Sequence, residues 1–148
     1  MSSFKKQIPE FKKSIDDDLK MILSESNQSS EELYQAMKYS VMNGGKRIRP
    51  MMMLASAVAI DIDTQHVIPF ATAIELLHSF SLIHDDLPCM DDDSLRRGQP
   101  TTHIKFGEAT ATLAADSLQS LAFELMAKAE FPESKSSQLE LISMIANS

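Results

Sequence analysis

The sequence predicts an all-α fold, and both its composition and its patterning indicate this class. Ala, Leu, Ile and Met are abundant among the 148 residues, aromatic residues make up 6%, and Trp does not occur. Such a mixture favours helices packed on helices over a β-sandwich. Apolar residues recur at spacings of three and four, and no strand-like alternation of any length is found. The chain is long enough for one domain with its own core.

The N-terminal segment predicts a helix with one apolar stripe. The stripe consists of Phe4, Ile8, Phe11, Ile15, Leu19 and Leu23. Pro9 is expected to interrupt its first turn. A capping box of Ser29 and Glu32 then opens a second helix. That helix runs to about Met42, where Asn43-Gly44-Gly45 ends it because Gly adopts positive φ without strain.

The remaining segments predict a third helix and, after it, three further helices separated by a loop and a turn. Pro50 suits the first position of the third helix. Residues 51–60 are apolar nearly all round, so we expect this helix to be buried on several sides. After it come a fourth helix over about 67–87, a polar loop over 90–100, a long helix over about 107–129, a turn over 132–137 and a last helix from 138.

Net charge, the N-terminal segment and the cysteine content limit the expected partners and location of the protein. The net charge of −7 argues against nucleic-acid binding through a broad basic face. The N-terminal segment has no long apolar core, so we expect no signal peptide and no membrane partner. The single Cys89 cannot form an internal disulfide and fits a reducing compartment. We therefore expect a cytoplasmic location.

The strongest chemical signal is a cluster of carboxylates at the end of the predicted fourth helix. Its five members lie within nine residues and are Asp85, Asp86, Asp91, Asp92 and Asp93. These charges repel one another and oppose the helix macrodipole unless a cation compensates them. A hard divalent cation with oxygen ligands is the natural candidate. Pro88 is expected to end the helix, which lets Asp91 fold back toward Asp85.

Other interpretations of this cluster fit less well. A calcium loop starting at Asp91 would need Gly where Arg96 stands and Glu where Thr102 stands. A zinc site would need paired Cys or His ligands, which the sequence lacks. The plain structural alternative is an acidic loop whose carboxylates are solvated.

Basic residues form a second constellation, Gly44-Gly45-Lys46-Arg47-Ile48-Arg49-Pro50, ahead of the third helix. Clustered cations at a helix N-terminus predict a metal-free anion site, and the alternative is a basic turn with surface salt bridges. His78 lies two helical turns before Asp85 on roughly the same face. It is either a hydrogen-bonded core residue or part of the binding site. Arg96-Arg97-Gly98 follows the aspartates. The two arginines either face different anions or offset the negative charge of the acidic loop.

Three segments together resemble the trans-polyprenyl diphosphate synthases, in particular the bacterial farnesyl diphosphate synthases. They are GGKRIRP, HSFSLIHDDLPCMDDDSLRRGQPT and FGEATATLAADSLQSLAFE, and the resemblance covers about residues 33–126. It implies an isoprenoid-synthase-type helical bundle that is homodimeric. It also implies condensation of an allylic diphosphate, dimethylallyl or geranyl, with isopentenyl diphosphate through Mg²⁺-assisted ionisation.

The resemblance assigns roles to individual residues. The isopentenyl diphosphate would be held by Lys46, Arg49, His78 and Arg97. Mg²⁺, with Mn²⁺ as an alternative, would be held against the allylic diphosphate by Asp85 and Asp91 with Asp86 nearby, and Arg96 would contact that substrate.

Phe80 is expected to limit product length. It lies five residues before Asp85, about 7.5 Å deeper along the helix, where a bulky ring would stop the growing chain. In the resembled family an aromatic residue here, together with the Pro88-Cys89 insertion, is typical of enzymes that make the C15 product. We therefore expect farnesyl diphosphate, with geranylgeranyl diphosphate as the alternative.

One departure from the resembled family is evident. No second aspartate-rich motif follows Asp116, so we expect residues 1–148 to be the truncated, N-terminal helical part of a single isoprenoid synthase domain. Such a chain would not complete catalysis alone, and a non-catalytic fragment or subunit is the alternative function. A terpene cyclase shares the aspartate-rich helix end but binds one diphosphate, so it has no use for GGKRIRP.

Overall fold

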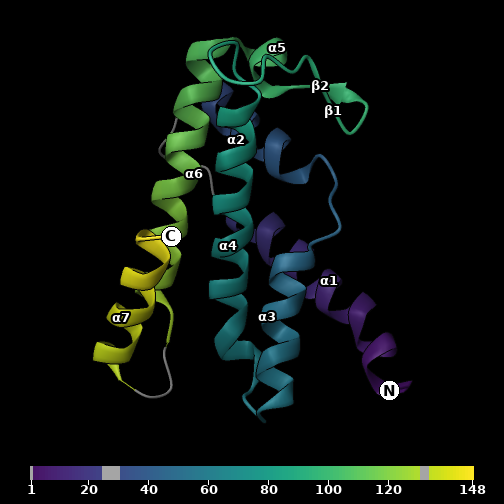
Figure 1. The fold of residues 1–148 in the computed structure, drawn as a ribbon, viewed down its shortest axis with the longest axis vertical. Coiled ribbons are helices and arrows are strands. Elements are labelled where there is room, and N and C mark those ends of the chain that lie inside the picture. Colours follow the sequence, from purple (N-terminus) through teal and green to yellow (C-terminus); the bar gives the residue numbers. More distant parts are fainter. Residues whose placement is uncertain (1, 25–30, 131–133) are drawn as a thin grey trace.

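The computed structural model describes residues 2–24, 31–130 and 134–148, and these residues form helices joined by short connections (Figure 1). The described elements are α1 (Ser2–Ile22), α2 (Glu31–Met42), α3 (Ile48–Ala59), α4 (Thr64–Asp85), β1 (Leu95–Arg96), β2 (Gln99–Pro100), α5 (Thr102–Phe106), α6 (Glu108–Lys128) and α7 (Lys135–Ala146). The predicted all-α class is confirmed.

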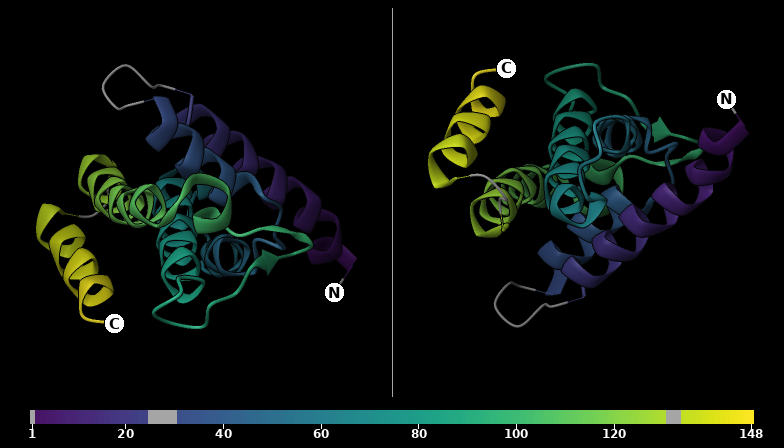
Figure 2. Two further views of the ribbon diagram at one scale, coloured as in Figure 1. Left: turned by 90° about the horizontal axis from the view of Figure 1, so that it is seen from above. Right: turned by 90° about the horizontal axis from the view of Figure 1, so that it is seen from below.

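The helix α4 stands at the centre of the bundle. It packs most extensively against α6 on one side and α3 on the other (Figure 1). The helix α1 crosses the bundle diagonally, whereas α7 lies outside α6 (Figure 2). The short helix α5 and the β1–β2 hairpin cover one end of the bundle, beside the C-terminal end of α4.

Small residues allow α6 to approach α4 closely. Ala111, Ala114, Ala115 and Ala122 are all fully buried on α6, with Leu118 among them. On α4 the fully buried Leu76 fills the same core. Burial of each such leucine stabilises the fold by about 1.5–3 kcal/mol relative to exposure, so this seam holds α4 in a defined position.

The apolar stripe predicted for α1 is confirmed, because Phe11, Ile15, Leu19 and Leu23 are buried. The predicted interruption at Pro9 is wrong, since α1 runs without a break from Ser2 to Ile22. Pro9 is exposed near the helix N-terminus, where the loss of one backbone hydrogen bond does not outweigh the packing of the stripe. The side chain of Phe4 and the predicted capping residue Ser29 lie outside what the structure describes.

The third helix differs from its prediction in two respects. It begins at Ile48 rather than Pro50. It buries Pro50, Leu54 and Ala57, but Met52 and Ile60 are 64% and 67% exposed. The expectation of burial on several sides is therefore wrong, because α3 lies at the edge of the bundle, where α4 and α1 cover part of its surface.

Differences at the remaining elements are small. The loop over 90–100 contains the two-residue strands β1 and β2, and α5 precedes the long helix. The last helix begins at Lys135 instead of 138, since the side chain of Ser134 caps it by accepting a hydrogen bond from the Ser137 amide. The predicted end of the second helix is confirmed at Met42.

Of the helices that the structure describes, α4 alone is long and apolar enough to cross a membrane by length and composition. It is also the most enclosed helix of this bundle, packed by α1, α2, α3 and α6, and it carries the buried Glu75. These features are those of a core helix.

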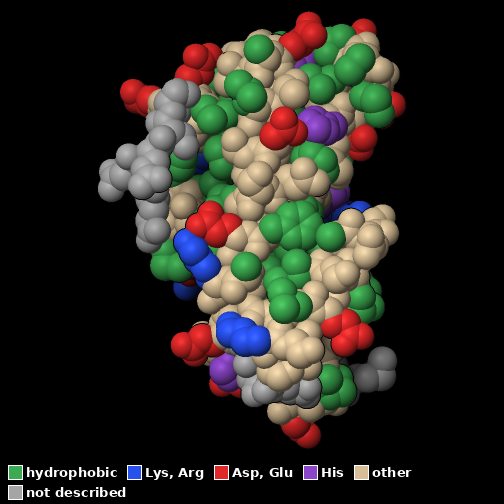
Figure 3. Space-filling view, turned by 90° about the vertical axis from the view of Figure 1, so that its left-hand side faces the viewer, with side chains coloured by type: hydrophobic (Ala, Val, Ile, Leu, Met, Phe, Trp, Pro, Cys, Tyr) green, Lys and Arg blue, Asp and Glu red, His purple; other side chains and the backbone are tan. Residues whose placement is uncertain are grey.

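Hydrophobic side chains gather in the middle of the side formed by α6 and α7 (Figure 3). Leu113 of α6 and Leu139 and Met144 of α7 are more than half exposed.

Candidate functional site

The loop between α2 and α3 has a backbone that turns sharply. Gly44 and Gly45 have φ of 79° and 140°, and Arg47 is left-handed with φ of 51°. A Cβ atom on Gly45 would lie 3.0 Å from Nη1 of Arg97 and 3.2 Å from Nη1 of Arg47. A side chain at 45 would be strained, because the φ of 140° disfavours one and two guanidinium groups approach the Cβ position.

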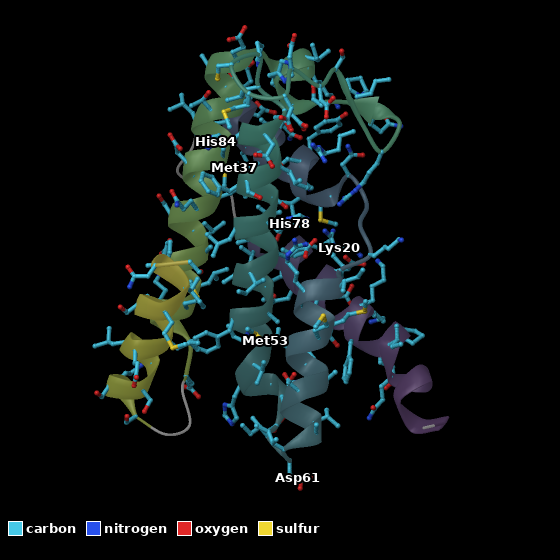
Figure 4. All side chains as sticks on the ribbon, viewed as in Figure 1. Lys20, Met37, Met53, Asp61, His78 and His84 are labelled. Carbon is cyan, nitrogen blue, oxygen red and sulfur yellow. The ribbon has the colours of Figure 1, made fainter. Side chains whose placement is uncertain are left out.

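Four predicted anion-binding residues line one cavity of about 570 Å³ beside this loop: Lys46, Arg49, His78 and Arg97. Arg49 Nη1 lies 3.4 Å from His78 Nε2. Arg97 comes from the β1–β2 hairpin and donates a hydrogen bond to the Gly44 carbonyl. The structure thus gathers cations from a loop, a helix and a hairpin around His78, which lies about two thirds of the way along α4 (Figure 4).

The surroundings of the His78 ring favour its neutral form. Partial burial lowers the pKa of His78, and the charge of Arg49 lowers it further, although Glu75 opposes this. The alternative of a packed core histidine is not what the structure shows, because His78 lines the cavity together with the cations.

Arg47 behaves differently from its neighbours in the same motif. It is 4% exposed, and its guanidinium group pairs with Asp16 and Glu75. Sequence reasoning did not find these partners. The one signal available was Glu75 itself, a carboxylate within an apolar helix that requires a buried partner.

The aspartate cluster occupies the C-terminal end of α4. The helix ends at Asp85, and the chain turns so that the Asp91 amide donates a hydrogen bond of 2.9 Å to the Asp85 carbonyl. The predicted return of Asp91 toward Asp85 is confirmed. Asp85 is half-buried and Asp91 is exposed, and neither carboxylate pairs with another residue in the described part of the chain.

Asp86 and Arg96 are placed differently from the expectation. Asp86 is 3% exposed, and its carboxylate accepts hydrogen bonds from Nε and Nη2 of Arg96 at 2.5–2.9 Å. The hydrogen bond to Asp86 raises the pKa of Arg96. We expected Asp86 near a metal ion and Arg96 at the allylic substrate, and in the structure the two side chains pair with each other.

The β1–β2 hairpin explains how adjacent arginines serve different partners. Arg97 and Gly98 both have positive φ, 54° and 77°, as a tight hairpin turn requires. Arg96 consequently faces the end of α4, whereas Arg97 faces the loop at Gly44. The sequence left open whether this pair binds anions or offsets the acidic loop. In the structure Arg96 pairs with Asp86 of the acidic loop, whereas Arg97 lines the cationic cavity.

The carboxylates that remain available fit a magnesium ion shared with a ligand. Within the described ranges no three His, Cys, Asp or Glu side chains are grouped so as to hold a metal. Mg²⁺ is usually held by one or two carboxylates together with substrate phosphates. Asp85 and Asp91, unpaired and brought together by a backbone hydrogen bond, suit that arrangement.

A second groove of about 570 Å³ continues from the cationic cavity, and Arg49 and His78 line both. Its other lining residues are of mixed character, with Ser81 and Gln119 beside apolar side chains. Phe80 lines the groove, with its ring edge-on to His84 at a centroid distance of 4.6 Å. His84 lies near the end of α4 (Figure 4), and its Nε2 is 3.7 Å from Oδ1 of Asp116 on α6. Further lining residues that sequence reasoning did not single out are Ile74, Leu77 and Phe123.

A family model described as polyprenyl synthetase matches residues 30–148. The chain belongs to the polyprenyl synthetase family. It is 55% identical over 96 residues to the farnesyl diphosphate synthase of Haemophilus influenzae, which covers 65% of this chain and 32% of that protein. To the geranylgeranyl diphosphate synthase of Methanosarcina mazei it is 51% identical over 100 residues, covering 68% and 30%.

Solved structures of this family superpose on nearly the whole chain. The geranyltransferase of Legionella pneumophila has a TM-score of 0.93 at 35% identity, covering 99% of this chain and 52% of that chain. The FPP/GFPP synthase of Zymomonas mobilis, in its apo form, has a TM-score of 0.90 at 37% identity, covering 98% and 52%. These matches confirm the resemblance and the isoprenoid-synthase-type bundle. The chain spans about a third of the curated relatives' length and about half of these solved chains.

Proposed function

We propose that this chain binds the two substrates of a prenyl transfer, isopentenyl diphosphate and an allylic diphosphate, and that the product is farnesyl diphosphate. One observation carries the proposal. The cationic cavity at His78 and the available carboxylates at Asp85 and Asp91 flank one stretch of α4 beside a second groove. His78 lies seven positions before Asp85, which is about 10 Å along the helix.

The cationic cavity suits a diphosphate without a metal. Arg49 and Arg97 offer planar guanidinium groups for phosphate oxygens, and the exposed Lys46 adds a mobile charge. The neutral His78 ring supplies one N–H donor without adding further repulsion to the cluster. These residues bind and orient the isopentenyl group so that its double bond faces the groove.

The carboxylates at the end of α4 suit the allylic diphosphate. Asp85 and Asp91 would hold Mg²⁺, or Mn²⁺ as an alternative, and the ion when bound neutralises the charge that develops on the leaving diphosphate. Arg96 holds the hairpin through Asp86. Its contact with the allylic diphosphate would use Nη1, the guanidinium nitrogen that Asp86 does not occupy.

The proposed reaction needs orientation more than a nucleophilic side chain. The allylic C–O bond breaks, the isopentenyl double bond attacks the cation to form a C–C bond, and a proton passes to the released diphosphate. Ile74, Leu77 and Phe123 give the groove an apolar wall that keeps water from the cation. Holding both substrates in place accelerates the reaction through proximity and orientation.

The proposed C15 product follows from the position of Phe80 in the groove. The alternative C20 product is supported by the similarity to the geranylgeranyl diphosphate synthase described above. We also propose a cytoplasmic homodimer. The exposed apolar side chains on α6 and α7 are a surface that a second copy would cover.

The proposal is tested first by binding. Calorimetric titration of the chain with isopentenyl diphosphate is expected to show binding without Mg²⁺, whereas geranyl diphosphate is expected to require Mg²⁺. Lys46→Ala and Arg49→Ala should each weaken isopentenyl diphosphate binding by about 10- to 100-fold, since a hydrogen bond to a charged group contributes about 1.5–3 kcal/mol. Lys38→Ala, an exposed lysine of α2 outside the cavity, is the matched control.

Turnover is then measured with radiolabelled isopentenyl diphosphate, geranyl diphosphate and Mg²⁺. Formation of labelled farnesyl diphosphate supports the proposal that the chain catalyses prenyl transfer. Binding of both substrates without product supports the alternative of a non-catalytic fragment or subunit. A chain that binds neither diphosphate contradicts the proposal.

A further inference from the structure

Three consecutive aspartates on α1 meet three different environments. Asp16 accepts hydrogen bonds from Nε of Arg47 at 2.9 Å and from Nζ of Lys12 at 2.5 Å. Asp17 pairs on the surface with Lys13 and Lys20. Asp18 accepts a hydrogen bond of 2.5 Å from Thr72 Oγ1. Of the three, Asp16 alone contacts the motif that lines the cationic cavity, although α1 precedes the residues that the family model matches.

Arg47 is a buried cation that needs every partner it has. Nη1 donates to Oε1 of Glu75 at 2.7 Å, Nη2 to the Val41 carbonyl at 2.9 Å, and Nε to Asp16. A guanidinium group removed from water is stable only when its donors are paired. The loss of Asp16 would leave Nε of a 4% exposed side chain without its carboxylate.

The position of Arg47 determines the shape of the loop. Its left-handed φ of 51° is unfavourable for a non-glycine residue, so contacts with other residues must hold it there. Its Nη1 also lies within 3.2 Å of the Cβ position of Gly45. The exposed Lys46 and Arg49 project from the same short segment, on either side of this anchored residue.

We propose that Asp16 is a positioning residue for the diphosphate cavity, acting through Arg47 on the loop that presents Lys46 and Arg49. The inference rests on the proposed function of that cavity. Asp16 is not among the described residues that line the cavity, so its effect on a ligand is indirect. The helix α1 thereby contributes to substrate affinity in addition to packing.

The charge of Asp16 can be separated from the packing of α1. The stripe of Phe11, Ile15 and Leu19 buries the helix independently of this carboxylate. Partial burial raises the pKa of Asp16, but the hydrogen bonds and charges of Lys12 and Arg47 outweigh it and leave the pKa below its ordinary value. The carboxylate is therefore ionised at neutral pH, and Asp16→Asn removes its charge while keeping its size.

The test compares Asp16→Asn with the control Asp17→Asn in the full chain. Isopentenyl diphosphate is titrated without Mg²⁺, and geranyl diphosphate is titrated with Mg²⁺. Asp16→Asn is expected to weaken isopentenyl diphosphate binding by about 10-fold, within the usual range of coupling between sites. Binding of geranyl diphosphate, and both titrations of Asp17→Asn, should stay within about twofold of wild type. Asp16→Glu, which restores the charge, should recover most of the lost affinity.

Circular dichroism confirms that each variant is folded. Asp16→Ser is the second variant, because it removes the same carboxylate with a smaller side chain. If only one of the two variants folds, the affinity of that variant tests the inference. Unchanged isopentenyl diphosphate affinity in a folded variant overturns the inference alone, whereas a wild-type chain that does not bind isopentenyl diphosphate overturns the proposed function and this inference with it. Equal weakening of both ligands indicates a general structural role and also overturns it.

Discussion

His78 is a histidine surrounded by cations, and its protonation state matters for any anion that enters the cavity. Burial and the charge of Arg49 lower its pKa below the ordinary value of 6.5, with smaller contributions from Arg97 and Arg96. Because the unfolded chain binds the proton more readily, the stability that depends on neutral His78 is complete above about pH 6.5. It is lost as the pH falls through the lowered pKa.

A bound diphosphate should reverse this shift. Its negative charge favours the imidazolium form, so we expect isopentenyl diphosphate to raise the pKa of His78 relative to the free chain. NMR titration of the histidine ring protons against pH, with and without the ligand, measures the change. His66, at the opposite end of α4, is the internal control, and its resonances should not respond to the ligand. A His78 titration curve that is the same with and without ligand contradicts its place in the site.

At the scale of the element, α4 lines two cavities. Glu75 lines the cationic cavity, Ile74, Leu77 and Phe80 line the groove toward α6 and α7, and His78 lines both. The fully buried alanines of α6 bring the second wall of the groove close. We therefore expect the side chains of Ile74, Leu77 and Phe80 on α4 to determine how deep the groove is.

Phe80→Ala should deepen the groove and allow a longer product. The ring lies against His84 and lines the groove together with Leu77, which precedes it on α4. If the chain turns over, we expect the C15 product to give way to C20 and longer products on reversed-phase chromatography. Independently of turnover, the variant should bind geranylgeranyl diphosphate with Mg²⁺ about 10-fold more tightly than wild type, since removal of a steric barrier of this kind is worth about 1–3 kcal/mol. Met52→Ala, on the exposed side of α3, is the control. The same product lengths and affinities as wild type would count against Phe80 as the limit.

At the scale of the whole molecule, local features were predictable and long-range pairings were not. Periodicity and turn residues predicted the helices, the end of α2 and the return of Asp91, because each depends on neighbours in sequence. The Asp86–Arg96 pair depends on where a hairpin folds, and the Asp16–Arg47 pair joins residues 31 positions apart. The exposure of Met52 was missed because composition does not reveal how many neighbours cover a helix.

The hairpin links the two parts of the candidate site across the molecule. Arg96 pairs with Asp86 at the end of α4, and Arg97 donates to the Gly44 carbonyl beside the cationic cavity. The cation and carboxylate clusters are thereby held at a set separation, although the chain as a whole carries a net charge of −7. The proposed function uses this separation to bind two anions side by side, one through cations directly and one through a metal.

This division predicts that the two ligands stabilise the fold under different conditions. A ligand at 100 times its dissociation constant stabilises the native state by about 2.7 kcal/mol, which for a chain of this size raises Tm by roughly 5–10 °C. Thermal melts followed by circular dichroism should show this rise for isopentenyl diphosphate in the presence of EDTA. For geranyl diphosphate the rise should require Mg²⁺.

The carboxylates that carry the metal dependence can be identified in the same assay. Asp91→Asn should abolish the Mg²⁺-dependent rise with geranyl diphosphate and leave the metal-free rise with isopentenyl diphosphate intact, because the two sites use different charges. Asp92→Asn, an exposed neighbour, should retain both rises. If geranyl diphosphate raised Tm equally in EDTA, the carboxylates at the end of α4 would not be holding a metal for it, and the cationic cavity would be the binding site for both ligands.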